Sequence, residues 1–93
     1  MISLEDCIAM SGLSPEEIAA IAEHEHVPEV AAAALGRYFL LHKRGGEEIR
    51  DIIVDDIRAA LAQGRVKHAA ELFSALRHFL ETHPEANTGL SPN

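Results

Sequence analysis

The chain has 93 residues, an apolar fraction of 47% and a net charge of −7 from 15 acidic and 8 basic residues. This length and composition are typical of one globular domain with a thin core, and they exclude an intrinsically disordered chain. An acidic surface repels phosphate groups, so we expect neither nucleic acids nor anionic membranes as partners.

Two capping boxes open the N-terminal part of the chain. Ser3 and Asp6 form a Ser-x-x-Asp box, which predicts a short helix that ends before Gly12. The stretch SPEE at residues 14–17 predicts a second helix, because it offers a capping serine, a first-turn proline and a glutamate that closes the box.

Pro28 decides whether this second helix ends or continues with a kink. Proline cannot donate a hydrogen bond to the carbonyl of His24, and it disfavours helical angles at Val27. The sequence leaves both outcomes open. A helical pattern resumes at Glu29 and extends to a basic cluster at residues 43–44, after which two glycines predict its end.

Two further helices follow, at residues 47–63 and 66–82. Residues 52–54 are all β-branched and resemble a strand, but the surrounding charges follow a helical period. Residues 84–93 have no periodicity and predict a flexible tail. We therefore predict an all-α fold in residues 1–83, a compact helical bundle of four main helices plus a short N-terminal helix.

The segment EHEHVPE is the densest cluster of potential metal ligands. On a continuous helix Glu23, His26 and Glu29 share one face, and Glu25 lies one turn before Glu29. The Glu-x-x-His spacing is that of di-iron carboxylate bundles, and two such helices in a dimer would supply a full set of ligands. Imidazole and carboxylate ligands would suit iron, manganese or zinc. Asp56, inside the apolar arc of its helix, is a further candidate ligand.

A simpler interpretation of the same residues needs no metal. If the chain breaks near Val27, His24 and His26 lie at the end of one helix and Glu29 lies at the start of the next, where the helix dipoles favour their charges. Asp56 would then pair with an arginine, because buried charges are almost always paired. The candidate arginines are Arg37, Arg50 and Arg77.

Small and large apolar residues cluster between residues 31 and 41. A run of four alanines and a glycine allows close approach of another helix, and four consecutive large apolar residues follow it. These four side chains cannot all face the core of one chain, so we predict a homodimer. The candidate interface residues are Ala32, Gly36, Tyr38, Phe39 and Leu40.

The sequence contains no motif of an enzyme, such as GxSxG, a P-loop, GxGxxG or HExxH. A helix-turn-helix over residues 4–27 would present acids to phosphate groups, which argues against DNA binding. Cys7 is the only cysteine and fits a cytoplasmic location, and we see no signal peptide. His68 and His78 are interpreted as surface residues. We therefore expect an interaction or regulatory protein, with metal binding as the alternative function.

Two stretches resemble a group of short proteobacterial helical proteins of uncharacterised function. They are IAEHEHVPEV at residues 21–30 and RHFLETHPE at residues 77–85. The resemblance implies a bacterial, cytoplasmic and all-helical protein. It implies no activity and no site residues.

Overall fold

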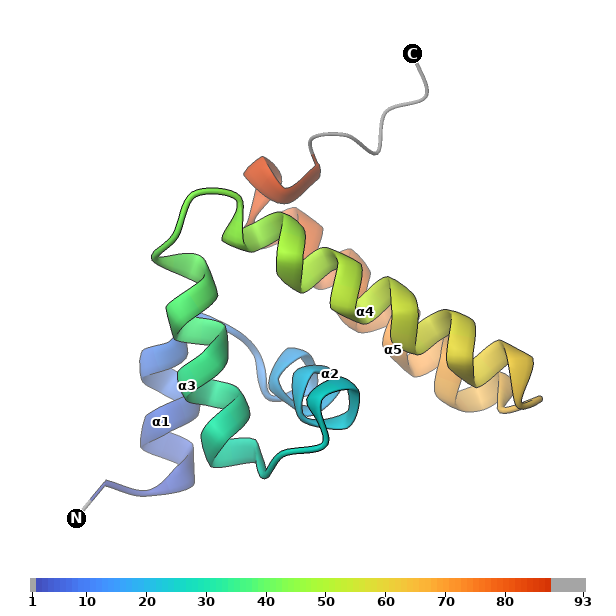
Figure 1. The fold of residues 1–93 in the computed structure, drawn as a ribbon, viewed down its shortest axis with the longest axis horizontal. Coiled ribbons are helices and arrows are strands. Elements are labelled where there is room, and N and C mark those ends of the chain that lie inside the picture. Colours follow the sequence, from blue (N-terminus) through green and yellow to red (C-terminus); the bar gives the residue numbers. More distant parts are fainter. Residues whose placement is uncertain (1, 88–93) are drawn as a thin grey trace.

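The structure is a computed structural model that describes residues 2–87, and it is built of helices (Figure 1). The α-helices are α1 (Leu4–Ser11), α2 (Pro15–Glu25), α3 (Glu29–Leu40), α4 (Gly45–Ala62) and α5 (Val66–Thr82), and a 3₁₀ helix η1 (Pro84–Asn87) follows. No strand occurs within residues 2–87, so the prediction of an all-α fold is confirmed. In this same range no helix is both long enough and apolar enough to cross a membrane.

Both capping boxes form as the sequence predicts. In the first box the Asp6 amide donates to Ser3 Oγ at 3.1 Å, and the Ser3 amide donates to Asp6 Oδ2 at 3.2 Å. In the second box the Glu17 amide donates to Ser14 Oγ at 3.2 Å, and the Ser14 amide donates to Glu17 Oε1 at 2.8 Å. Each box satisfies two backbone N–H groups that no helical carbonyl can reach, which stabilises the start of α1 and of α2.

The chain breaks before Pro28 and does not continue as a kinked helix. His26 has a left-handed φ of 58° and closes α2. The Val27 amide donates to the Ala22 carbonyl at 3.1 Å, and Pro28 becomes the N-cap residue of α3, a position at which its missing N–H is not needed. The two outcomes that the sequence left open are thus decided in favour of two separate helices.

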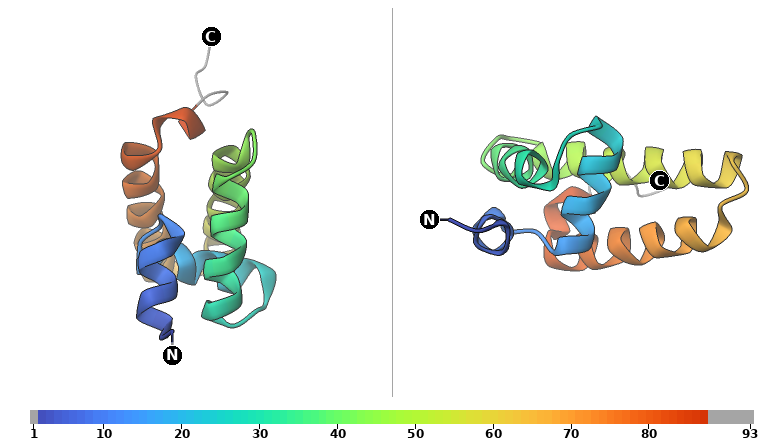
Figure 2. Two further views of the ribbon diagram at one scale, coloured as in Figure 1. Left: turned by 90° about the vertical axis from the view of Figure 1, so that its left-hand side faces the viewer. Right: turned by 90° about the horizontal axis from the view of Figure 1, so that it is seen from below.

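The helices pack as two pairs joined by α2. The long helices α4 and α5 form an antiparallel hairpin, α2 crosses this hairpin, and α1 and α3 lie side by side and run in the same direction (Figures 1 and 2). The largest fully buried side chains come from the three central helices α2, α4 and α5. They are Ile18, Ile21, Ile49, Ile53 and Phe79.

The connection between α3 and α4 differs from the prediction. Two glycines were expected to end a helix, but α3 ends at Leu40 and Gly45 begins α4. Arg44 has a left-handed φ of 67°, which turns the chain back toward the end of α3. A Cβ atom at Gly45 would collide with the carbonyl group of Phe39, so this close approach requires glycine.

The first residues of the predicted tail are helical. Residues 84–87 form η1, in which Ala86 is fully buried. Arg50 of α4 is itself buried, and its Nη1 donates to the Ala86 carbonyl at 2.9 Å. This contact holds η1 against α4, so the ordered fold extends past residue 83. Residues 88–93 of the predicted tail lie outside the described residues.

Candidate functional site

The break after α2 separates the predicted metal ligands. Glu23 and Glu25 lie in the last turn of α2, His26 is the exposed residue that closes it, and Glu29 is exposed in the first turn of α3. The single helical face that these residues were expected to share does not exist. Within residues 2–87 no three His, Cys, Asp or Glu side chains are arranged to hold a metal ion. The continuous helix on which the predicted iron, manganese or zinc site was based is therefore absent.

The acids and histidines near the end of α2 pair with each other and with the hairpin. His24 Nδ1 lies 2.6 Å from Glu25 Oε2, and its Nε2 lies 3.4 Å from Asp55 Oδ2 on α4. His68 Nε2 on α5 lies 2.7 Å from Glu23 Oε1. Burial by itself would lower the pKa of His24, but its hydrogen bonds to Glu25 and Asp55 outweigh burial and raise it. These contacts tie the end of α2 to both long helices.

Asp56 is a buried acid, one of whose carboxylate oxygens is unsatisfied among the described residues. It is 5% exposed, and its Oδ2 has no hydrogen-bond partner among the described residues. Burial and the nearby charge of Glu23 raise the pKa of this carboxyl to about 6. The expected pairing with an arginine is wrong. The three candidates contact other groups: Arg50 contacts Asp51 and Ala86, Arg37 contacts Met10, and Arg77 contacts Glu81.

Asp56 lines a cavity of about 490 Å³, where the end of α2 faces α4 and the turn between α4 and α5. The cavity wall carries the carboxylates of Glu23, Asp55 and Asp56 and the guanidinium of Arg65. His24 and His26 also line it. Three acids therefore face one permanently charged base, and the cavity can accept hydrogen bonds from a cation; His24, whose pKa is raised, adds positive charge when it is protonated.

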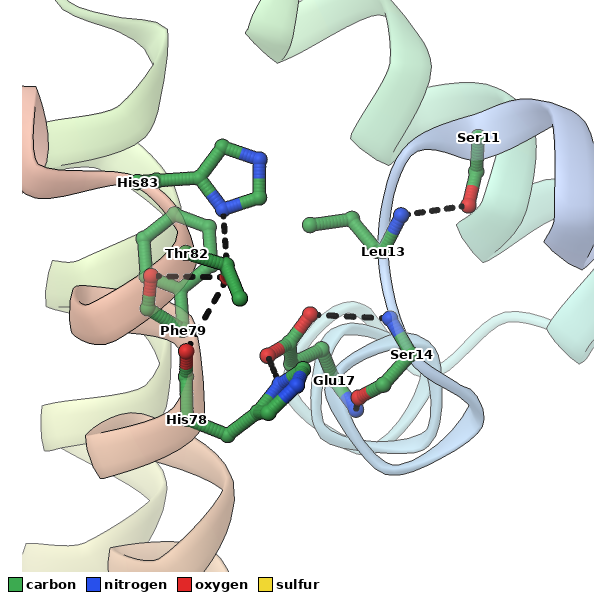
Figure 3. Close-up of polar contacts among 8 residues, drawn as sticks. All are labelled: Ser11, Leu13, Ser14, Glu17, His78, Phe79, Thr82 and His83. Carbon is green, nitrogen blue, oxygen red and sulfur yellow. Dashed lines mark hydrogen bonds and ion pairs between the residues drawn. The ribbon is translucent and has the colours of Figure 1, made fainter.

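A second buried acid, Glu17, has donors for both oxygens (Figure 3). Oε1 accepts from the Ser14 amide at 2.8 Å, and Oε2 accepts from Nδ1 of His78 at 2.7 Å. The hydrogen bond to Glu17 raises the pKa of His78, whose side chain is 54% exposed. The hydrogen bonds of the described residues link His78 to no serine or cysteine side chain, and the pair joins α2 to α5.

The sequence alone does not reveal this pair, because each half of it has a simpler explanation. Glu17 completes a capping box, which is normally a surface feature, and His78 was interpreted as a surface residue. The signal was the position of Glu17 one helical turn before Ile21, which places it on the buried face of α2. Only the crossing of α2 over α5 brings the histidine to it.

A largely apolar groove of about 630 Å³ lies between α1 and α3. Arg37 is at one end of it, where its Nη1 donates to the Met10 carbonyl at 3.3 Å. Met10 is 55% exposed and Val30 is 52% exposed, so side chains of both walls are open to solvent. The full lining is Cys7, Met10, Ser11, Val30, Ala33, Ala34 and Arg37.

The predicted interface residues divide between the core and the surface. Ala32 and Gly36 are buried within their own chain, where α3 uses its small residues to approach α2 and the preceding loop. They are therefore not available to a second chain, which corrects the prediction for these two positions. Phe39 and Leu40 are half-buried, and Tyr38 is 55% exposed.

No protein-family model, curated protein or solved structure matches the chain. The resemblance to short bacterial helical proteins therefore stays a prediction from two stretches of sequence. Function has to be inferred from the groove and the cavity.

Proposed function

We propose that the protein acts through protein–protein interaction and that its first partner is a second copy of the same chain, docked at the groove between α1 and α3. The observation that carries this proposal is an exposed apolar stripe on α3 that continues from the groove. The stripe consists of Val30, Ala34, Tyr38 and Leu41, which follow one another at intervals of three or four residues.

This stripe makes α3 apolar on two sides. Its inner side is buried in the chain through Ala32, Ala33 and Gly36. On its outer side Tyr38 is 55% exposed and Leu41 is 69% exposed. A helix that is apolar on opposite sides is normally covered on both of them, so the outer side is suited to an interface.

The charges beside the groove favour a second copy over an unrelated partner. Because α1 and α3 run in the same direction (Figure 1), their acidic first turns, with Glu5, Asp6 and Glu29, lie at one end of the groove, and Arg37 lies at the other. A two-fold axis that crosses the outer side of α3, midway between Glu29 and Arg37 along the helix, would make the two copies of α3 antiparallel. Each Arg37 would then face Glu29 of the other copy, and every such contact occurs twice.

The mass of the particle in solution tests this proposal. Light scattering at about 50 μM should give twice the chain mass of 10.1 kDa. Val30→Glu places a charge in the groove and should yield a single-chain mass. Val66→Glu is the matched control, since Val66 is 68% exposed on α5 and does not line the groove, and this variant should stay dimeric.

A charge exchange tests the two-fold arrangement. Arg37→Glu alone should weaken the dimer, and so should Glu29→Arg alone, because each variant brings like charges together. An equimolar mixture of the two variants should recover the dimer, because each copy then supplies the charge that the other needs. A single-chain mass for the wild type at every concentration tested, or a Val30→Glu variant that still dimerises, would refute the proposal.

A further inference from the structure

The two buried acids, Glu17 and Asp56, differ in the hydrogen bonds that their carboxylate oxygens accept. Both oxygens of Glu17 accept hydrogen bonds, at 2.8 Å from Ser14 and at 2.7 Å from His78. Asp56 is 5% exposed, yet its Oδ2 accepts no hydrogen bond from any of residues 2–87. A buried carboxylate is costly unless it is paired, so the contrast points to a donor from outside the described chain.

The cavity wall next to this unpaired carboxylate suits a small organic cation. Glu23 and Asp55 add negative charge to it, and Arg65 is the one permanent cation among the described lining residues. Ala59 and Ala60 line the same cavity and offer apolar surface to an alkyl chain. The cavity volume of about 490 Å³ lies within the range of about 300–1,000 Å³ that is usual for small-molecule sites.

An ammonium group fits this cavity better than a divalent metal ion does. A metal ion needs several ligands that converge on one point, and no three potential ligands within residues 2–87 do so. Glu23 already bonds to His68 at 2.7 Å, and Asp55 lies 3.4 Å from His24. An ammonium group can donate to the one unpaired carboxylate and gain from the surrounding negative charge while those pairs stay intact.

We propose that the cavity between α2, α4 and the α4–α5 turn binds a primary alkylammonium group, which donates to Asp56 and lays its alkyl chain against Ala59 and Ala60. The group belongs either to a free diamine or to a lysine side chain of another protein, since both present the same chemistry. This site shares no lining residue with the groove between α1 and α3, so it does not rest on the proposed dimer.

Thermal melting of the full chain at about pH 7.5 tests the proposal and separates the two sources. The probes are 1,4-diaminobutane and Nα-acetyl-lysine methylamide at about 10 mM, with 1,4-butanediol as the uncharged match. At least one ammonium probe should raise the melting temperature, and butanediol should not. A rise with the diamine alone indicates a free amine, and a rise with the lysine derivative alone indicates a lysine side chain. No rise with either probe, or an equal rise with butanediol, overturns the proposal.

Three variants identify the group that binds the probe. Asp56→Asn keeps the shape of the side chain but removes its charge, so it should abolish the rise. Glu48→Gln changes an exposed acid on the same helix and should keep the rise. Arg65→Gln removes the competing cation from the wall, so calorimetry should show severalfold tighter binding. An Asp56→Asn variant that keeps the rise, or an Arg65→Gln variant that binds more weakly, contradicts the proposal.

Divalent metal ions provide the competing outcome. Zinc or manganese chloride, added in place of the amine, should leave the melting temperature of the wild type unchanged. A rise with either metal that is lost in Asp56→Asn would show that the cavity is a metal site and that the ammonium proposal is wrong.

Discussion

Replacing Asp56 by asparagine should make the protein increasingly more stable, relative to the wild type, as the pH rises through about 6. Oδ2 of Asp56 has no hydrogen-bond partner in the described chain, so the amide loses no contact that this oxygen makes. The pKa of the carboxyl is raised from 3.8 to about 6, because burial penalises the charged form and Glu23 repels it. The folded state therefore holds this proton more tightly than the unfolded state does. The stabilisation that the raised pKa of Asp56 contributes is fully present below pH 3.8, where both states are protonated, and it is lost as the pH rises through about 6.

The size of the effect follows from the two pKa values. Their difference of about 2 units corresponds to about 3 kcal/mol of folding free energy lost once Asp56 is ionised in both states. The amide in Asp56→Asn does not ionise and avoids this loss. The free energy of unfolding of the variant, minus that of the wild type, should therefore increase by about 1–1.5 kcal/mol between about pH 5 and pH 7.5. Any cost of burying the amide is constant and leaves this slope unchanged.

Urea denaturation followed by far-ultraviolet circular dichroism, on dialysed protein at several pH values, measures this difference. Glu48→Gln is the control, because it removes an exposed charge from the same helix and should give a difference that varies little with pH. A difference for Asp56→Asn that does not change with pH would refute the reasoning, and so would a difference that falls as the pH rises from 5 to 7.5. Either result would show that folding does not raise the pKa of Asp56.

Two other substitutions test the tight turn and the contact between α2 and α5. Gly45→Ala should lower the free energy of unfolding by about 3 kcal/mol, because its Cβ would collide with the Phe39 carbonyl. Gly64→Ala adds a Cβ with no atom within 4 Å, so its only cost is the left-handed φ of 74°, and it should lower the free energy of unfolding by only about 1 kcal/mol in the same urea experiment. Equal losses for the two alanine variants would contradict the argument. His78→Ala should destabilise the protein because Glu17 Oε2 loses its donor. Folding raises the pKa of His78, so this loss of stability should be largest below about pH 6.5 and should shrink as the pH rises through the raised pKa. Urea denaturation that shows the same loss at every pH would argue against the His78–Glu17 pair.

Most helix boundaries could be predicted from the sequence alone because they depend on neighbouring residues. The capping boxes at Ser3 and Ser14 join residues three positions apart, so the same hydrogen bonds are available before the chain packs. The helical period of the charges around residues 52–54 likewise ruled out a strand. Pro28 was less informative, because proline permits both a kink and a break. The left-handed conformation of His26, which closes α2, is visible only in the folded chain.

Burial and pairing were decided by the tertiary structure. Glu17 meets His78 across 61 positions of sequence, and Arg50 meets Ala86 across 36. The sequence placed Asp56 on an apolar helical face, but only the packing of α2 against the hairpin leaves it in a cavity wall with no hydrogen bond to its Oδ2 from the described residues. Such contacts depend on which helices cross and at what angle. Local hydrogen bonds and side-chain period do not determine that geometry, because it is set by how the apolar faces of the helices fit together.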